Sequence, residues 1–168
     1  MRAVLSIGSN MADRWALLRG VHAEFRGELV AASPVYSTPP WGVTDQDEFL
    51  NAVLIVDVDA SPLELLRRGQ RLENEAERVR VRHWGPRTLD VDVVQVTGDD
   101  GAEVHSDDPV LTLPHPYAHE RAFVLVPWLA ADGEARLHGR RVFDLVAGLE
   151  ASEVESIRRV GTLEDGER

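Results

Sequence analysis

The sequence predicts one α+β domain of the ferredoxin-like class, in which an antiparallel-rich sheet carries helices packed on one face. The first observation is the order of apolar patterns, which reads β-α-β-β-α-β up to residue 96. The second is the length of 168 residues, enough to bury about two thirds of the unfolded surface in a single core. The third is the absence of cysteine, which excludes disulfides and thiolate metal sites. We assign the domain to residues 1–150 and expect a frayed polar tail over 151–168.

The first half of the chain alternates between apolar strands and one helix. Residues 2–8 form an apolar run that ends at a Gly-Ser-Asn turn, and apolar side chains then recur with helical spacing over 15–25. A strand broken near Pro34 is expected over 28–37. The nearly continuous apolar run over 49–59 is typical of a central strand.

A second helix has the clearest start signal in the chain. Ser61-Pro62-Leu63-Glu64 is a capping box with proline at the first helical position. The helix is expected to reach Glu77, with Leu63, Leu66 and Leu72 facing inward. Two long loops are expected, one over 38–49 before the central strand and one over 78–87 after this helix.

The second half begins with a strand over 89–96, followed by a turn-rich connection over 98–109. We expect an irregular segment over 111–123 and a short buried helix or strand over 123–132. A final helix is predicted over 139–149.

Charge and composition exclude several classes of partner. The net charge of −11 disfavours binding to duplex nucleic acid or to an anionic membrane, because both partners need a basic face. No lysine is present, so neither a Walker A loop nor a lysine Schiff base can form. The chain has no apolar run of roughly 20 residues, and its first residues lack the apolar region of a signal peptide, so a cytoplasmic protein is expected.

Seven arginines are concentrated in the segment that precedes the strand at 89–96. They are Arg67, Arg68, Arg71, Arg78, Arg80, Arg82 and Arg87. Those on the expected helix are best explained as a solvated face that pairs with Glu64 and Glu75. Those in the loop that follows can match phosphate oxygens bidentately.

The stretch WGPRTLDVD, residues 84–92, carries two carboxylates on one strand face. Asp90 and Asp92 are expected side by side about 6 to 7 Å apart, where they repel each other unless a cation lies between them. Such a pair can be the solvent face of an amphipathic strand, or it can hold Mg²⁺. With Arg87 adjacent, the metal interpretation points to phosphoryl transfer.

Two further side chains have both a structural and a functional interpretation. Trp84 can anchor a core or lid, or stack on a planar ring. His115 is held between Pro114 and Pro116, and its imidazole can be structural or can contact a phosphate.

Several motifs, taken together and in order, resemble the 6-hydroxymethyl-7,8-dihydropterin pyrophosphokinase family of folate biosynthesis. They are IGSN (7–10), STPPWG (37–42), FLNA (49–52), RVR (78–80), WGPRTLDVD (84–92), LTLPH (111–115) and RAF (121–123). The resemblance implies a ferredoxin-like sheet and an enzyme that transfers the β,γ-diphosphate of ATP to the hydroxymethyl oxygen of the pterin, releasing AMP. The expected substrates are therefore two small molecules, and a monomer is expected.

The same resemblance implies three overlapping groups of site residues. The catalytic group is Arg78, Arg87, Asp90, Asp92, His115 and Arg121, in which the two aspartates would hold two Mg²⁺ ions. The ATP-binding group is Glu73, Arg78, Arg80, Arg87, Leu111, Thr112, His115 and Arg121. The pterin-binding group is Gly8, Thr38, Pro39, Trp41, Phe49, Asn51, Trp84 and Phe123, with the two phenylalanines sandwiching the ring.

Loops over 40–48 and 77–86 would close over the site and exclude water, and Asp92 would help to remove the hydroxymethyl proton. Val110, Pro116 and His119 depart from the family pattern on the ATP side. Two other interpretations remain open from the residues alone. One is a different DxD-dependent nucleotidyl or glycosyl transferase, and the other is a non-enzymatic ferredoxin-like module that binds RNA or protein.

Overall fold

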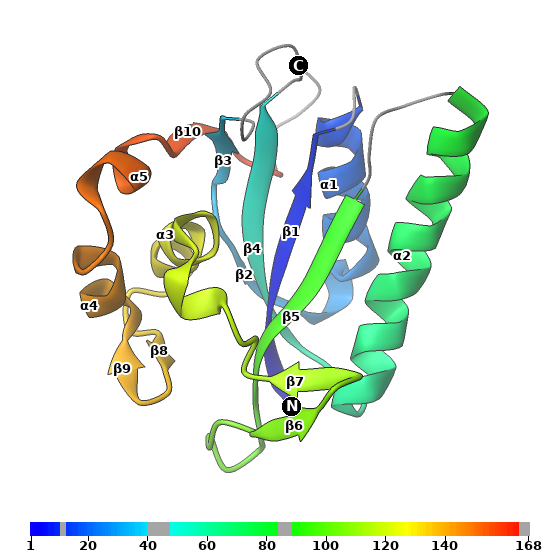
Figure 1. Ribbon diagram of the computed structural model, residues 1–168. Helices are drawn as coiled ribbons and strands as arrows, with labels where there is room; N and C mark the ends of the chain where they lie inside the picture. Colours follow the sequence, from blue (N-terminus) through cyan, green and yellow to red (C-terminus); the bar gives the residue numbers. More distant parts are fainter. Residues whose placement is uncertain (11–12, 40–47, 84–88, 165–168) are drawn as a thin grey trace.

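A six-stranded antiparallel sheet forms the centre of the molecule (Figure 1). The computed structural model describes residues 1–10, 13–39, 48–83 and 89–164, with side chains except at 79–83. The strand order is β10-β3-β4-β1-β5, and β2 also pairs with β4. The strands are β1 (Arg2–Ser9), β2 (Leu29–Ala32), β3 (Val35–Thr38), β4 (Phe49–Asp57), β5 (Leu89–Thr97) and β10 (Arg158–Gly161).

The predicted ferredoxin-like order is confirmed. Helix α1 (Arg14–Glu24) follows β1, and α2 (Pro62–His83) connects β4 to β5. The four strands β3, β4, β1 and β5 then lie in the order expected for a β-α-β-β-α-β unit, with β1 at the centre between β4 and β5. The strand expected to break near Pro34 is indeed two strands, β2 and β3.

Helices cover both faces of the sheet, so the expectation that they lie on one face is wrong. On the second face, α3 (Ala122–Ala131) and α4 (Val142–Ala147) pack beside the sheet (Figure 1). The reason is visible in β1, which is buried at every position after Arg2. A strand that is apolar on both sides requires a cover on both sides, and Trp128 of α3 supplies it against Val4 and Val53.

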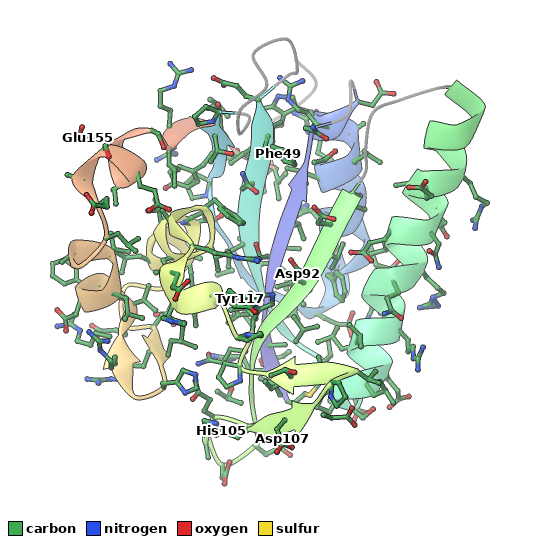
Figure 2. All side chains as sticks on the ribbon, in the orientation of Figure 1. Phe49, Asp92, His105, Asp107, Tyr117 and Glu155 are labelled. Atoms are coloured by element: carbon green, nitrogen blue, oxygen red, sulfur yellow. The ribbon has the colours of Figure 1, made fainter. Side chains whose placement is uncertain are left out.

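The second face is apolar over only part of its area. Figure 2 labels Phe49 on β4 and Asp92 on β5, which lie on this face beyond the part covered by α3. Strand alternation sends successive side chains of β5 to opposite faces, so Leu89 and Val91 enter the opposite core while Asp90 and Asp92 do not.

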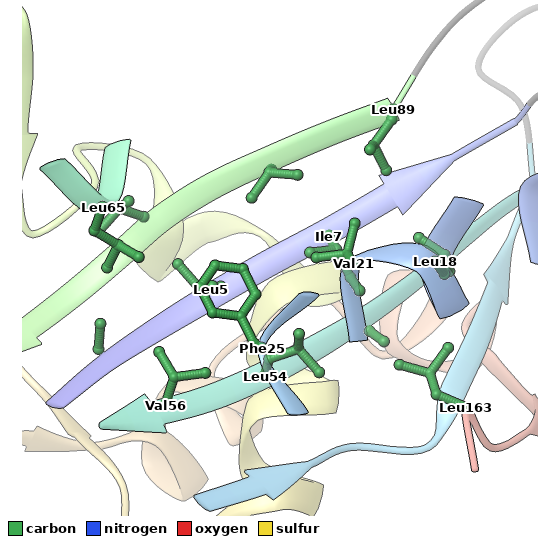
Figure 3. Packing of buried hydrophobic residues seen from close by; sticks show 14 of the residues in the cluster. Leu5, Ile7, Leu18, Val21, Phe25, Leu54, Val56, Leu65, Leu89 and Leu163 are labelled. Atoms are coloured by element: carbon green, nitrogen blue, oxygen red, sulfur yellow. The ribbon is translucent and has the colours of Figure 1, made fainter. Parts of the chain in front are cut away.

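The first face carries the larger core, formed where α1 and α2 pack on the sheet (Figure 3). Its labelled members are Leu5, Ile7, Leu18, Val21, Phe25, Leu54, Val56, Leu65, Leu89 and Leu163. Arg68 is part of this packing: its guanidinium lies 4.2 Å from the Phe25 ring centroid and donates to Glu24 and Glu28. It therefore links α2 to α1, and does not pair with Glu64 or Glu75 as expected.

Helix α2 differs from the expectation in its length and in its inward face. It continues to His83, because no glycine or proline falls between Glu77 and His83 and β-branched residues cost only about 0.5 kcal/mol each in a helix. The loop predicted over 78–87 is thus wrong for 78–83. Although α2 is the longest helix, none of the described helices is long and apolar enough to cross a membrane.

The inward face of α2 is formed by Leu65, Gly69, Leu72 and Ala76, which recur with helical spacing. Of the predicted Leu63, Leu66 and Leu72, Leu63 is 45% exposed and Leu66 is half-buried. A Cβ on Gly69 would meet Val91 Cγ1 at 3.0 Å, so glycine allows α2 to lie close to β5. The predicted capping box is confirmed, since the Ser61 N–H donates to Glu64 Oε1 and the Glu64 N–H donates to Ser61 Oγ.

The second half of the chain contains more regular structure than expected. The connection and the irregular segment include a hairpin of β6 (Ser106–Asp108) and β7 (Leu111–Leu113), and the segment over 123–132 is helical. The predicted final helix is shorter, because the hairpin β8–β9 (Arg136–Leu137 and Arg140–Arg141) precedes α4. Short 3₁₀ turns occupy Arg26–Glu28 and Ala118–Glu120.

The frayed tail expected over 151–168 is wrong for residues 151–164. Residues Ala151–Glu155 form α5, and β10 pairs with β3 at the edge of the sheet. Leu163 is 4% exposed within the first-face core. Without β10, β3 would be the edge strand with unpaired backbone N–H and C=O groups, and β10 pairs with these groups.

Candidate active site

A cavity of about 730 Å³ opens on the second face of the sheet, beyond α3. Its lining comes from six parts of the chain: β1, the end of β3, the start of β4, β5, the segment that begins α3, and the segment that contains α5. The lining residues are Ser6, Gly8, Thr38, Pro39, Phe49, Asn51, Asp90, Asp92, Arg121, Ala122, Phe123, Glu150, Ser152, Glu153, Ser156 and Ile157.

The floor of the cavity is set by strand register. Gly8 of β1 is paired with Asn51 of β4 on one side and with Asp90 of β5 on the other. A Cβ at Gly8 would lie 2.7 Å from Asn51 Oδ1, so glycine is what allows the amide to lie over β1. Asn51 Nδ2 donates to Thr38 Oγ1 at 3.1 Å, which fixes the amide toward β3.

The two carboxylates stand beside small residues of the central strand. Asp90 is opposite Gly8, and Asp92 is opposite Ser6. Asp90 is exposed and Asp92 is half-buried, and both line the cavity. The small neighbours leave space above the two aspartates, where oxygen ligands can face a hard cation such as Mg²⁺.

A basic wall faces these carboxylates. Arg121 lines the cavity just before α3, with its guanidinium 5.6 Å from the Phe123 ring centroid. The first turn of α3 also begins here, and a helix N terminus favours an anionic group. The wall therefore combines a permanent cation with oriented backbone N–H groups.

His115 is held beside this wall by backbone contacts. Its backbone N–H donates to the Val94 carbonyl at 2.8 Å, and its imidazole Nδ1 accepts from the Tyr117 backbone N–H at 3.1 Å. Burial lowers the pKa of His115, the charge of Arg121 lowers it further, and Asp92 opposes both. The imidazole is therefore neutral at pH 7, with Nε2 as its proton donor.

Two aromatic rings complete the cavity. Phe49 begins β4 and Phe123 lies in the first turn of α3, and both are half-buried lining residues. They provide an apolar surface for a flat ring next to the polar Asn51 and Thr38. The site thus has an aromatic and amide half and a charged half.

The structure brings together most of the predicted residues that it describes. Gly8, Thr38, Pro39, Phe49, Asn51, Asp90, Asp92, Arg121 and Phe123 all line the cavity. Trp41, Trp84 and Arg87 lie outside the described residues, as does the side chain of Arg80. Residues 40–47 of the first predicted lid and 84–86 of the second lie there too, whereas residues 77–83 of the second lid belong to α2.

Five predicted ATP-binding residues are described but are not among the lining residues found for the described part of the chain: Glu73, Arg78, Leu111, Thr112 and His115. Glu73 Oε2 accepts the Val91 N–H at 2.7 Å, which satisfies a donor on the outer edge of β5. Thr112 Oγ1 donates to the Asp108 carbonyl within the β6–β7 hairpin. Arg78 is exposed on α2.

Sequence reasoning missed one wall of the cavity, which is formed by residues around α5: Glu150, Ser152, Glu153, Ser156 and Ile157. The pairing of Arg158 with Ser37 anchors this segment beside β3. The available signal was the three-residue spacing of Val154 and Ile157, both half-buried. Ser6 and Ala122 were also missed, since small residues carry little pattern.

Comparisons with known proteins identify relatives of this chain. The family model for 7,8-dihydro-6-hydroxymethylpterin-pyrophosphokinase matches residues 4–133. A Mycobacterium tuberculosis protein named 2-amino-4-hydroxy-6-hydroxymethyldihydropteridine pyrophosphokinase is 48% identical over 166 residues, covering 94% of this chain and 88% of the relative. A protein of the same name from Methylorubrum extorquens is 41% identical, covering 93% and 98%.

Solved structures show the same fold. A crystal structure described as HPPK-DHPS in complex with substrates aligns with a TM-score of 0.64 at 12% identity, over 92% of this chain. HPPK-DHPS A437G of Plasmodium falciparum aligns with a TM-score of 0.61, over 87% of this chain. This chain spans 43% and 45% of those two chains, respectively. The family match and the identities over most of both chains establish that this chain belongs to the 7,8-dihydro-6-hydroxymethylpterin-pyrophosphokinase family and is an enzyme of the pyrophosphokinase class.

Proposed function

We propose that this enzyme transfers the β,γ-diphosphate of ATP to the hydroxymethyl oxygen of 6-hydroxymethyl-7,8-dihydropterin. The oxygen bonds to the β-phosphorus as the bond from that phosphorus to the α,β-bridging oxygen breaks, so AMP leaves and the hydroxymethyl proton is released. The observation that carries the proposal is the position of Asp90 and Asp92 in the same cavity as Phe49 and Phe123. One cavity thus offers sites for both reactants.

The pterin is proposed to bind at the aromatic half of the cavity. Phe49 and Phe123 would stack on its two faces, a favourable arrangement for a flat heterocycle. Asn51 would bind the hydrogen-bonding edge of the ring, with its amide oriented by the 3.1 Å contact to Thr38. Pro39 adds a rigid apolar wall at the end of β3.

The triphosphate is proposed to lie along the charged half. Arg121 and the α3 N terminus would contact phosphate oxygens, and neutral His115 would donate through Nε2. Arg78 and Arg87 are expected to neutralise the transferring group, as the resemblance implies. The contact of Glu73 with Val91 supports a structural role for Glu73 at the edge of β5.

Asp90 and Asp92 would hold two Mg²⁺ ions, and their oxygen donors fit that metal. When bound, the ions supply positive charge that offsets the charge of the triphosphate and lets both carboxylates remain ionised. Asp92, the more buried of the two, would also assist removal of the hydroxymethyl proton.

The test is AMP formation from ATP and Mg²⁺ with and without the pterin, with AMP and ADP separated by chromatography. We expect AMP only when pterin is present. ADP alone, or pterin-independent turnover of another nucleotide, would contradict the proposal and favour a different DxD-dependent transferase. The expected monomeric state and cytoplasmic location stay predictions.

A further inference from the structure

Three potential metal ligands meet at the end of the sheet away from the cavity. Glu103 and His105 follow β5 in the connection that folds back on it, and His138 lies in the turn between β8 and β9. Figure 2 labels His105 at the foot of the molecule, well below Asp92. We call Glu103, His105 and His138 the histidine cluster.

The donor atoms of the histidine cluster lie close to the spacing that a small metal ion requires. His105 Nε2 is 3.2 Å from Glu103 Oε1, and His138 Nδ1 is 3.9 Å from the same oxygen. One donor atom from each residue lies within 4.8 Å of the other two. Ligands of a tetrahedral zinc ion with bonds of about 2.0–2.1 Å are about 3.3 Å apart, so adjustments of roughly 1 Å would close the site.

The carboxylate is oriented by contacts that do not involve the imidazole rings. Glu103 is 15% exposed, and its Oε2 accepts from Gln95 Nε2 at 2.5 Å and from the His138 N–H at 3.1 Å. These two donors occupy one oxygen and turn the other toward the histidines. Such outer contacts are what fix the ligands of protein metal sites.

The histidines are accessible to an ion from solvent. The His105 and His138 side chains are 61% and 53% exposed, and their ring centroids are 5.6 Å apart. His138 and Gly139 both have positive φ, at 52° and 77°, as a two-residue hairpin turn of type I′ requires. This tight turn restricts the backbone that carries the His138 ring.

We propose that Glu103, His105 and His138 bind one divalent transition-metal ion of the Zn²⁺ type, with water completing the coordination. Two imidazoles and one carboxylate suit Zn²⁺, Co²⁺ or Ni²⁺, whereas Mg²⁺ prefers oxygen ligands and would not compete. The ion would connect the segment after β5 to the β8–β9 hairpin. This site is independent of the proposed reaction.

The first test is a titration of the whole 168-residue chain with Co²⁺ at pH 7.5. A tetrahedral or five-coordinate Co²⁺ ion absorbs visible light far more strongly than hydrated Co²⁺, and Zn²⁺ should displace it. We expect one ion per chain. His105→Ala and His138→Ala should each weaken binding at least tenfold, and His105→Gln is a second variant that retains more of the side chain.

Two controls separate the histidine cluster from other sites. His119 is exposed and its Nε2 lies 3.3 Å from Glu120 Oε1, so His119→Ala removes a single His–Glu contact of similar length elsewhere. Asp92→Asn weakens the cation site proposed in the cavity. Co²⁺ absorption should persist in both variants.

A thermal melt provides a second readout. At a Zn²⁺ concentration 100-fold above the dissociation constant, the melting midpoint should rise by roughly 5–10 °C, and the rise should vanish in the His105 and His138 variants. Binding weaker than millimolar in the parent protein would overturn the proposal. So would equal binding in the histidine variants, or loss of the signal in Asp92→Asn alone.

Discussion

The two faces of the central sheet are built from the same strands but differ in what they carry, since one face holds the larger core and the other holds the cavity. On β1, Leu5 and Ile7 enter the first-face core, while Ser6 and Gly8 line the cavity on the other face. On β5, Val91 enters the core and the adjacent Asp92 lines the cavity. Strand alternation thus lets stability and chemistry be encoded at alternate positions, with the core holding the strands in the register that places the carboxylates.

The largest expected effect separates the two faces by activity. Asp92→Ala should lower pterin-dependent AMP formation by at least roughly 10³-fold, because a proposed metal ligand is lost. The free energy of unfolding should change by no more than about 1 kcal/mol, since the side chain contributes little to the core. Steady-state kinetics and urea unfolding together check this, and near-normal AMP formation would exclude Asp92 from the reaction.

A substitution in the first-face core should have the opposite effect, lowering stability without changing activity. Leu5 is 1% exposed, and Leu5→Ala should lower the free energy of unfolding by about 2–5 kcal/mol. The fraction that remains folded should keep its activity, because Leu5 points away from the cavity. Loss of activity without loss of stability would show that the two faces are not separable.

A third change tests the floor of the cavity. In Gly8→Ala the new Cβ would displace Asn51 Oδ1, so we expect the KM for pterin to rise roughly tenfold, the effect of one lost hydrogen bond. Gly20→Ala is the matched control, since Gly20 lies in α1 with nothing within 4 Å of its added Cβ. That control should stabilise the protein by about 0.5–1 kcal/mol and leave KM unchanged.

The smallest expected effect concerns pH. Burial lowers the pKa of His22 in α1, with Arg26 reinforcing and Glu164 opposing the shift. The unfolded chain therefore binds a proton more readily than the folded one below about pH 6.5, and stability falls as the pH drops through that value. The pH dependence of urea unfolding between pH 7 and 5 should be shallower in His22→Gln, and an unchanged slope would contradict the assignment.

The sequence predicts local features well because they depend on neighbouring residues. The capping box at Ser61 and the placement of Asp90 and Asp92 on one face of a strand follow from short patterns, and the structure confirms both. The family resemblance, carried by motifs from 7 to 123, is confirmed as well. The function of individual site residues remains a prediction.

Features that depend on distant packing were not predictable. The sequence predicts the wrong inward face for α2, because Gly69 carries no apolar signal. Its close approach to Val91 nevertheless places Gly69 on that face. The cavity wall formed by residues around α5 depends on the pairing of β10 with β3, which places Ser156 and Ile157 at the cavity. No local pattern in a polar segment reveals that it will pair with a sheet edge more than 120 residues earlier in the chain.

The most direct test of the account is to follow the β-phosphorus of ATP. With ATP labelled at that position, the enzyme is incubated with Mg²⁺ and 6-hydroxymethyl-7,8-dihydropterin, and the label is located after separation of the products. The account predicts that the label leaves with the pterin product while unlabelled AMP accumulates. Label retained in ADP would mean that only the γ-phosphate moves, and would contradict diphosphate transfer at this site.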